Sequence, residues 1–359
     1  MKKKKKEKKI LYQLIFSAFL LFSNAYLVKA NSDILSQDST GKYCINTEQD
    51  YYNFIENIQN YNNKTVILCN DIDISDVPEA TSSFGGILNG KGHTITYASK
   101  EAKENIAVFP FRINDNGIVE NINVQIDESY AYNSETDEFQ TVFSRCDGIA
   151  KGITIKGNVT CIYDDEDTDV YIGAIEGNGT LMDSSIAITY DLQSEKTIEE
   201  IADDIVDNDL SFEFCQLGTI NTGITYQNCI GYGQYSEAIK SLADELEPKI
   251  KDNTWGYLCV SFTRKSFFST SASATNCYYD KENMPDIKIM SEYITNRDNN
   301  KEFPNYADFG KTTSEMKNQG TYEGFDFNKK WTISPEDNNG YPYYNPQTEE
   351  ITLKVQAST

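Results

Sequence analysis

The stretch that decides the fold is Phe84-Gly85-Gly86-Ile87-Leu88-Asn89-Gly90-Lys91-Gly92, which runs directly into His93-Thr94-Ile95-Thr96-Tyr97. Its glycines allow the backbone conformations that a tight chain reversal needs. The residues that follow alternate in polarity and are rich in β-branched and aromatic types, which is typical of a strand with one buried face. The stretch therefore predicts a unit made of a short strand, a turn rich in Gly and Asn, and another strand.

Similar units recur along the chain. They begin near residues 108, 142, 171, 214 and 258, and most of them place a Gly or Asn turn between two apolar runs. A unit of roughly 20–25 residues cannot bury its own apolar face, so it must stack on its neighbours. The uneven spacing of the starts predicts insertions at the turns. We therefore expect an all-β solenoid with Asn side chains, such as Asn121 or Asn276, stacked at its turns.

Three segments have helical periodicity instead. Thr47 precedes acidic residues and an apolar pattern of helical spacing, which predicts an N-terminal capping helix that ends near Asn60. Residues 197–206 and 235–247 are amphipathic and acidic. We expect these two to be short helical insertions on the flank of a sheet.

Two parts of the chain resemble bacterial secreted and surface proteins of the GLUG-repeat, adhesin-like type. The first is residues 68–95, which contain the opening stretch, and the second is residues 313–343, with Tyr322-Glu323-Gly324-Phe325-Asp326-Phe327 and Asn339-Gly340-Tyr341-Pro342-Tyr343. The resemblance covers residues 43–345 in order, although the family's Gly-Leu-Phe cores are replaced here by pairs such as Val108-Phe109. It implies a right-handed parallel β-helix with an N-terminal capping helix.

Together, the residue patterns and the resemblance divide the chain into five parts. They are a signal peptide at 1–30, a flexible mature N-terminus at 31–42, a parallel β-helix with its N-terminal cap at 43–290, a C-terminal aromatic capping motif at 291–345 and a polar tail at 346–359. We interpret the aromatic residues of the C-terminal motif as a plug over the open end that hides a sheet edge. The alternative is an aromatic patch that stacks on sugars.

Residues 1–30 have the order of a secretory signal peptide. A lysine-rich run at Lys2–Lys9 is followed by an apolar stretch at 10–22, and Val28 and Ala30 occupy the −3 and −1 positions of a small-residue cleavage site. The alternative is an uncleaved anchor, but polar residues dilute the stretch and a span needs about 20 apolar residues. We expect an exported, extracellular protein, and the family resemblance alone implies association with the cell surface.

The charge of the chain limits its partners. The leader contains eight Lys and one Glu, so its removal changes the net charge from −23 to −30. Such a surface repels phosphate backbones, anionic lipid and polyanionic glycans. We therefore expect no nucleic-acid partner, and no membrane contact after the leader is cleaved.

All eight cysteines lie outside the leader, and their irregular spacings contain no CxxC pair. Zinc binding is therefore not indicated. Up to four disulfides are possible in an exported chain, and the alternative is that the thiols are small buried apolar groups. The cysteines are Cys44, Cys69, Cys146, Cys161, Cys215, Cys229, Cys259 and Cys277.

Catalytic signatures are absent from the sequence. His93 is the only histidine, and its place in a turn predicts a structural hydrogen bond rather than catalysis. Some proteins of the family that the chain resembles carry metallopeptidase activity, but this chain has no HExxH, so the resemblance does not imply that activity here. The acidic run Asp164–Asp169 could hold Ca²⁺ or form a solvated turn, and it lacks the Gly and distal Glu of an EF-hand. We assign no catalytic, cofactor-binding or metal-ligating residue.

Two functions fit these observations. The first is a non-enzymatic surface for adhesion or for binding an extracellular glycan or a host or cell-surface protein. The second is a carbohydrate-active β-helix enzyme, either a polysaccharide lyase or a hydrolase. Hydrolysis needs two carboxylates about 5–10 Å apart, so converging acidic pairs in a groove would distinguish the two.

Overall fold

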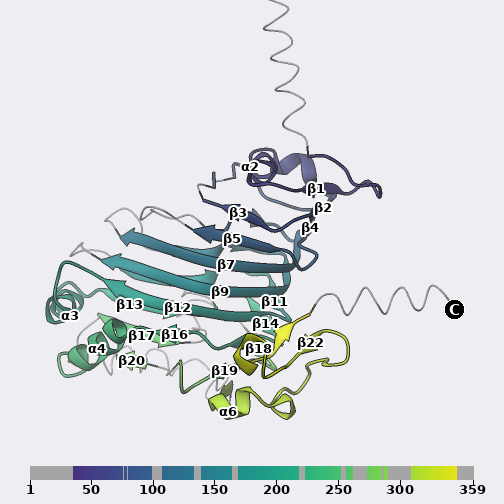
Figure 1. The fold of residues 1–359 in the computed structure, drawn as a ribbon. Helices are drawn as coiled ribbons and strands as arrows, with labels where there is room; N and C mark the ends of the chain where they lie inside the picture. The colour runs from purple at the N-terminus through teal and green to yellow at the C-terminus, as the bar shows by residue number, and fades with distance from the viewer. Residues whose placement is uncertain are drawn as a thin grey trace, which may run out of the picture.

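The computed structural model describes residues 35–75, 77–78, 80–98, 107–132, 139–163, 169–217, 223–251, 256–261, 273–284, 287–289 and 309–345. These residues form a mostly β protein with two sheets in which neighbouring strands are almost all parallel (Figure 1). The expected signal peptide and polar tail lie outside the described residues, as do residues 164–168 of the acidic run.

The large sheet contains 15 strands among the described residues. Its longest strands, β7 and β9, lie at its centre (Figure 1). The strands are β1 (Tyr43–Ile45), β2 (Thr65–Leu68), β3 (Ile72–Ile74), β4 (Ile87–Asn89), β5 (Thr94–Ala98), β7 (Ile118–Tyr132), β9 (Ile149–Tyr163), β11 (Thr180–Met182), β12 (Ser185–Gln193), β14 (Thr225–Gln227), β15 (Ile230–Gly231), β16 (Gln234–Tyr235), β18 (Ser273–Thr275), β19 (Tyr278–Asp280) and β21 (Gly310–Lys311).

The small sheet faces the large one, and the chain alternates between the two sheets from β6 to β19. Five of its strands begin close to the predicted unit starts, so that prediction is confirmed. Among its described strands, β20 alone runs antiparallel to its neighbour. The strands are β6 (Phe109–Ile113), β8 (Phe139–Cys146), β10 (Val170–Ile175), β13 (Ser211–Cys215), β17 (Tyr257–Ser261) and β20 (Ile287–Ile289).

Identical or similar residues of successive units stack on one another in the large sheet. Ile87, Ile118 and Ile149 pair in register on β4, β7 and β9, which makes the repeat 31 residues here. The expected unit of 20–25 residues is therefore too short for this region, because the 15-residue strands β7 and β9 lengthen each unit. Gly90 permits the close stacking, since an added Cβ would lie 2.5 Å from Asn121 O in the next unit.

The core lies between the two sheets. Val124, Ile155 and Ile186 stack in register with their side chains buried, and the strands of the small sheet contribute residues such as Ile172 and Phe214 from the opposite side. Apolar side chains that alternate along a strand point to one face, which is why the polar residues between them face outward.

Helix α2 (Glu48–Glu56) covers the N-terminal end of the stack, as predicted. The Thr47 side chain accepts a hydrogen bond from the Asp50 amide, and Phe54 is buried against Phe84 and Phe111. A 3₁₀ turn at Ile58–Tyr61 follows the helix. The Leu35 amide donates to the Tyr61 hydroxyl at 3.0 Å, so the described part of the expected flexible segment is tied to the fold.

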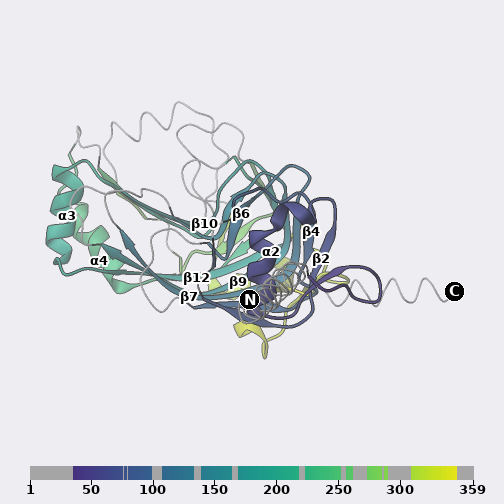
Figure 2. The same ribbon diagram turned by 90° about the horizontal axis from the view of Figure 1, so that it is seen from above.

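Both predicted helical insertions are present, as α3 (Ile198–Asp207) and α4 (Glu237–Leu246). They pack side by side at one edge of the two sheets (Figures 1 and 2). Thr197 and Glu200 form a reciprocal cap at the start of α3, and Lys249 pairs with Asp203 at 2.8 Å to join the two helices.

The C-terminal segment, residues 309–345, was predicted to plug the open end of the stack with its aromatic residues, and the structure shows this only in part. Strand β21 pairs with β19 and so covers that sheet edge. The aromatic residues instead pack on the outward face of the large sheet, against Ile230 and Tyr278. This segment contains α6 (Thr313–Met316), 3₁₀ turns at Gln319–Thr321 and Asn338–Gly340, and the antiparallel pair β22 (Trp331–Thr332) and β23 (Tyr343–Tyr344).

The cysteines divide between the two interpretations, a disulfide and small buried apolar groups. Cys44 and Cys69 form a disulfide at the N-terminal end of the large sheet. The other six cysteines form no disulfide in the structure described and are buried, as small apolar groups would be. The connectivity could not be read from the sequence, because eight cysteines allow 105 possible sets of pairings.

Candidate functional site

A groove runs along the outward face of the large sheet. Its first wall consists of side chains that alternate with the core residues of β5, β7 and β9, namely Thr94, Asn123, Gln125, Thr154 and Lys156. Asn123 pairs with Thr154, and Gln125 with Lys156, so the polar side chains form two adjacent rows. The alternation that fills the core with Val124 and Ile155 therefore also produces a hydroxyl- and amide-rich wall.

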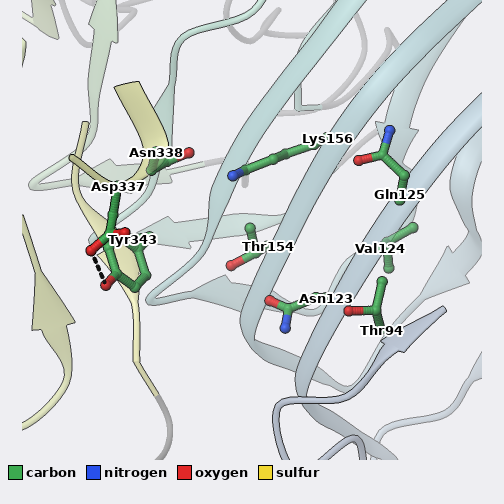
Figure 3. Close-up of a pocket in the computed structure, with 9 residues that line it drawn as sticks. All are labelled: Thr94, Asn123, Val124, Gln125, Thr154, Lys156, Asp337, Asn338 and Tyr343. Atoms are coloured by element: carbon green, nitrogen blue, oxygen red, sulfur yellow. Dashed lines mark hydrogen bonds between the residues drawn. The ribbon is translucent and has the colours of Figure 1, made fainter. Parts of the chain in front are cut away.

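The second wall comes from the C-terminal segment. Asp337, Asn338 and Tyr343 face the polar rows, and the cavity between the two walls has a volume of about 390 Å³ (Figure 3). This wall is held in place by Asn338, whose side-chain amide donates to the Tyr232 hydroxyl at 3.0 Å. The ring of Tyr232 stacks on that of Tyr341 at 4.4 Å, and burial raises the pKa of Tyr232 to about 12.

The sheet turns that support this wall share one conformation. Asn121, Gly152, Asp183, Asn228 and Asn276 stack one above another with positive φ angles, a set that we call the corner ladder. The expectation that Asn121 and Asn276 stack at turns is confirmed. Asn and Asp tolerate the left-handed region better than other side chains, and their amides and carboxylates can bond along the stack.

Hydrogen bonds run along the lower part of the corner ladder. Asn276 Nδ2 donates to Asn228 Oδ1 at 3.3 Å, and Asn228 Nδ2 donates to Asp183 Oδ1 at 2.9 Å. Lys330 of the C-terminal segment completes the row by binding Asp183 Oδ2 at 3.0 Å. The segment is thereby anchored to the turns of the sheet.

Gly152 provides a second anchor. An added Cβ at this position would lie 2.5 Å from Tyr344 Cε1, so the ring of Tyr344 occupies the space that a side chain would otherwise fill. Tyr344 belongs to β23, which also carries Tyr343 into the groove. The absent side chain at Gly152 therefore helps to set the position of the second wall.

The charges in the groove are sparse. Lys156 extends its amine from β9 toward the C-terminal segment (Figure 3), and in the described structure it makes no ion pair or hydrogen bond. Burial lowers the pKa of Lys156, because no carboxylate offsets the loss of water around the ammonium. Across the groove, the Asp337 carboxylate is exposed and accepts a 3.5 Å hydrogen bond from the Tyr343 hydroxyl.

This combination of groups suits recognition of a polar ligand. Amides and hydroxyls offer both donors and acceptors, one tyrosine ring offers an apolar surface, and one ammonium offers a charge. Asp337 is the single carboxylate among the described residues that line the groove. Two-carboxylate hydrolysis would need a second acidic residue there.

The structure also locates the candidates from the sequence. His93 Nδ1 lies 3.0 Å from Asp71 Oδ1, which also accepts from the Thr94 amide, so His93 makes a hydrogen bond of the kind predicted. Asp169, the one described member of the acidic run, accepts hydrogen bonds from the Ser211 amide and the Tyr171 hydroxyl. Within the described ranges, no group of three or more His, Cys, Asp or Glu side chains is placed to hold a metal ion.

The groove residues were not predicted. The alternation around Asn123 and Lys156 could have indicated their outward direction, but nothing local indicated that residues 337–343 would lie opposite. Among the helices of the described chain, none is long and apolar enough to span a membrane.

In comparisons with known proteins, no family model, no curated protein and no solved structure matches this chain.

Proposed function

We propose that this chain is an exported, right-handed parallel β-helix whose groove binds extracellular glycans without cleaving them. The proposed fold is supported by the alternation of the chain between two parallel sheets and by the in-register stacking of equivalent residues. The proposed export is supported by the signal-peptide pattern of residues 1–30. The GLUG-like, adhesin-like identity is supported by the motifs at 68–95 and 313–343.

One observation carries the proposed binding function. The groove combines rows of amide and hydroxyl groups with the ring of Tyr343, in a cavity of about 390 Å³. Sugars present hydroxyls that need donors and acceptors, and apolar faces that stack on aromatic rings. The cavity is at the lower end of the usual size of ligand sites, which suits one or two sugar units.

The aromatic residues of the C-terminal segment then have two roles. Trp331, Phe325 and Tyr344 are buried in the cluster that docks the segment on the sheet. Tyr343 is only partly buried and lines the groove, so it remains available to a ligand. The proposed sugar-stacking surface therefore rests on Tyr343, whereas the buried rings dock the segment on the face of the sheet.

The lining favours binding over the alternative of a carbohydrate-active enzyme. Its carboxylate, Asp337, has no acidic partner among the residues around the described cavity. The cation, Lys156, lies on the opposite wall (Figure 3). Turnover of any polysaccharide by the purified chain would overturn the non-enzymatic part of the proposal.

A glycan array probed with residues 31–359 tests the proposal. Gln125→Ala removes an exposed amide from the groove, and we expect about a 2- to 10-fold loss of affinity for the bound glycans. The matched control is Gln227→Ala, on the exposed strand β14 outside the groove, which should bind as the parent does. Absence of glycan binding, or equal affinity of the parent and Gln125→Ala, would contradict the proposal.

A further inference from the structure

Lys156 has an environment unlike that expected for a surface lysine. The chain carries a formal charge of −23, so carboxylates are plentiful, and described lysines such as Lys196, Lys249 and Lys330 each contact one. Lys156 is partly buried on β9 and contacts none in the described structure. A partly desolvated ammonium without a counter-ion is a net cost to the folded protein.

The neighbours of Lys156 define what could offset that cost. Gln125 pairs with it in register, and Asn123 and Thr154 form the adjacent row. These groups are neutral, and they can bind hydroxyls but cannot neutralise the ammonium. Figure 3 shows the amine directed into the space between the walls, where a ligand would lie.

We propose that the groove selects a sugar unit bearing a single carboxylate, which accepts a hydrogen bond from Lys156 Nζ while Asn123, Gln125 and Thr154 bind the sugar hydroxyls. This inference rests on the proposed glycan-binding function and specifies its ligand class. The ligand would supply the counter-ion that the protein omits, and a charge-assisted hydrogen bond is about twice as strong as a neutral one.

The number and type of charges favour one carboxylate over a polyanion. A protein of this negative charge repels every charge of an extended polyanion at long range. A glycan with a single acidic sugar at its end carries one such charge, so the repulsion is much smaller. A phosphate dianion would call for more than one cation or for a bidentate Arg. Lys156 is the single basic residue among those that line the described groove.

The test compares matched pairs of ligands and matched pairs of protein variants. The probes are oligosaccharides that end in glucuronate, galacturonate or sialate, each paired with its carboxyl-reduced form. Binding is measured by titration calorimetry to residues 31–359, to Lys156→Met, and to Lys151→Met, which removes a lysine from the same strand outside the groove. Lys156→Arg keeps the charge and serves as the second variant.

We expect the parent chain to bind at least one acidic probe about 10-fold or more tightly than its reduced form. Lys156→Met should abolish this preference, while Lys151→Met should retain it fully and Lys156→Arg largely. The ligand comparison on the parent chain stands even if a variant fails to fold.

Two outcomes would overturn the inference and leave the proposed function intact. In the first, the acidic and reduced probes bind equally well and Gln125→Ala weakens the binding of both. In the second, a folded Lys156→Met variant still prefers the acidic probe to its reduced form. If neither these probes nor any neutral glycan binds, the proposed function fails together with the inference.

Discussion

Lys330 Nζ lies 3.0 Å from Asp183 Oδ2, although 147 residues separate the two in the chain. Asp183 is buried on the corner ladder, where Asn228 also donates to it, and Lys330 comes from the segment that forms the second wall of the groove. The geometry of the groove therefore depends on a polar contact between the sheet turns and a segment that follows all of the stacked units.

Replacing Lys330 by Met should loosen the C-terminal segment. Asp183, whose side chain is 5 % exposed, would lose its cation and keep the hydrogen bond from Asn228, and leaving a buried oxygen without its partner costs about 1–3 kcal/mol. We expect a lower midpoint of chemical unfolding and faster proteolytic cleavage near residues 309–345. Lys329→Met changes an exposed neighbour and is the control, so equal behaviour of the two variants would show that the contact does not anchor the segment.

Gly157→Ala should destabilise the large sheet severely. Gly157 lies on β9 with φ of +143°, and an added Cβ would lie 1.7 Å from Ile126 O. Both the steric overlap and the backbone conformation oppose the substitution, and we expect a loss of about 2 kcal/mol or more in the free energy of unfolding.

Gly41→Ala separates the two effects. Gly41 has φ of +81° but no atom within 4 Å of an added Cβ, so this variant shows the backbone contribution alone. We expect about 1 kcal/mol for Gly41→Ala by denaturant unfolding. If Gly157→Ala cost no more than Gly41→Ala, the close stacking of β7 and β9 would be contradicted.

Removing the disulfide should weaken the N-terminal end of the stack. The bond joins Cys44 and Cys69, which are 25 residues apart, and a loop of this size predicts about 2–4 kcal/mol of stabilisation. Cys44→Ser should therefore lower the melting temperature of the oxidised protein. Reductant should lower that of the parent by a similar amount and leave Cys44→Ser unchanged, and a further drop in the variant would indicate another disulfide.

Asp147 should contribute to the pH dependence of stability. Burial alone would raise the pKa of Asp147, but Arg145 and Arg112, whose Nε atoms lie 3.1 and 2.6 Å from Oδ2, hold this pKa below its ordinary value. A depressed pKa stabilises the fold above about pH 4, where the unfolded carboxyl is ionised, and this contribution disappears as the pH falls through the folded pKa.

Urea unfolding of Asp147→Asn between pH 2 and 7 checks this sign. The variant should be less stable than the parent at neutral pH, and the difference should shrink as the solution becomes more acidic. A stability difference that stayed constant across the range would contradict the role assigned to the two arginines.

Much of the fold could be predicted because its signals are local. Thr47 and Thr197 are caps whose side chains bond within a few residues, and the apolar alternation of β7 and β9 shows in their own sequences. The length of the repeat could not be predicted as well. It is set by how far the strands β7, β9 and β12 stay paired, which depends on neighbouring units and not on any one segment.

The groove could not be predicted, because it depends on contacts between residues far apart in the sequence. Lys156 faces outward because Ile155 faces the core, but its position opposite Tyr343 results from the docking of the C-terminal segment. That docking uses Gly152, a residue whose contribution is the space it leaves for Tyr344. Sequence periodicity describes each wall separately and cannot bring the two together.

Hydrogen exchange with and without a saturating oligosaccharide that binds on the array gives the most direct test of glycan binding in this groove. Slower exchange is predicted in peptides from β7 and β9 and, at the same time, in peptides from residues 331–345, while β10 and β13 of the small sheet stay unchanged. Protection confined to the small sheet, or to one wall of the groove without the other, would contradict binding between the sheet and the C-terminal segment.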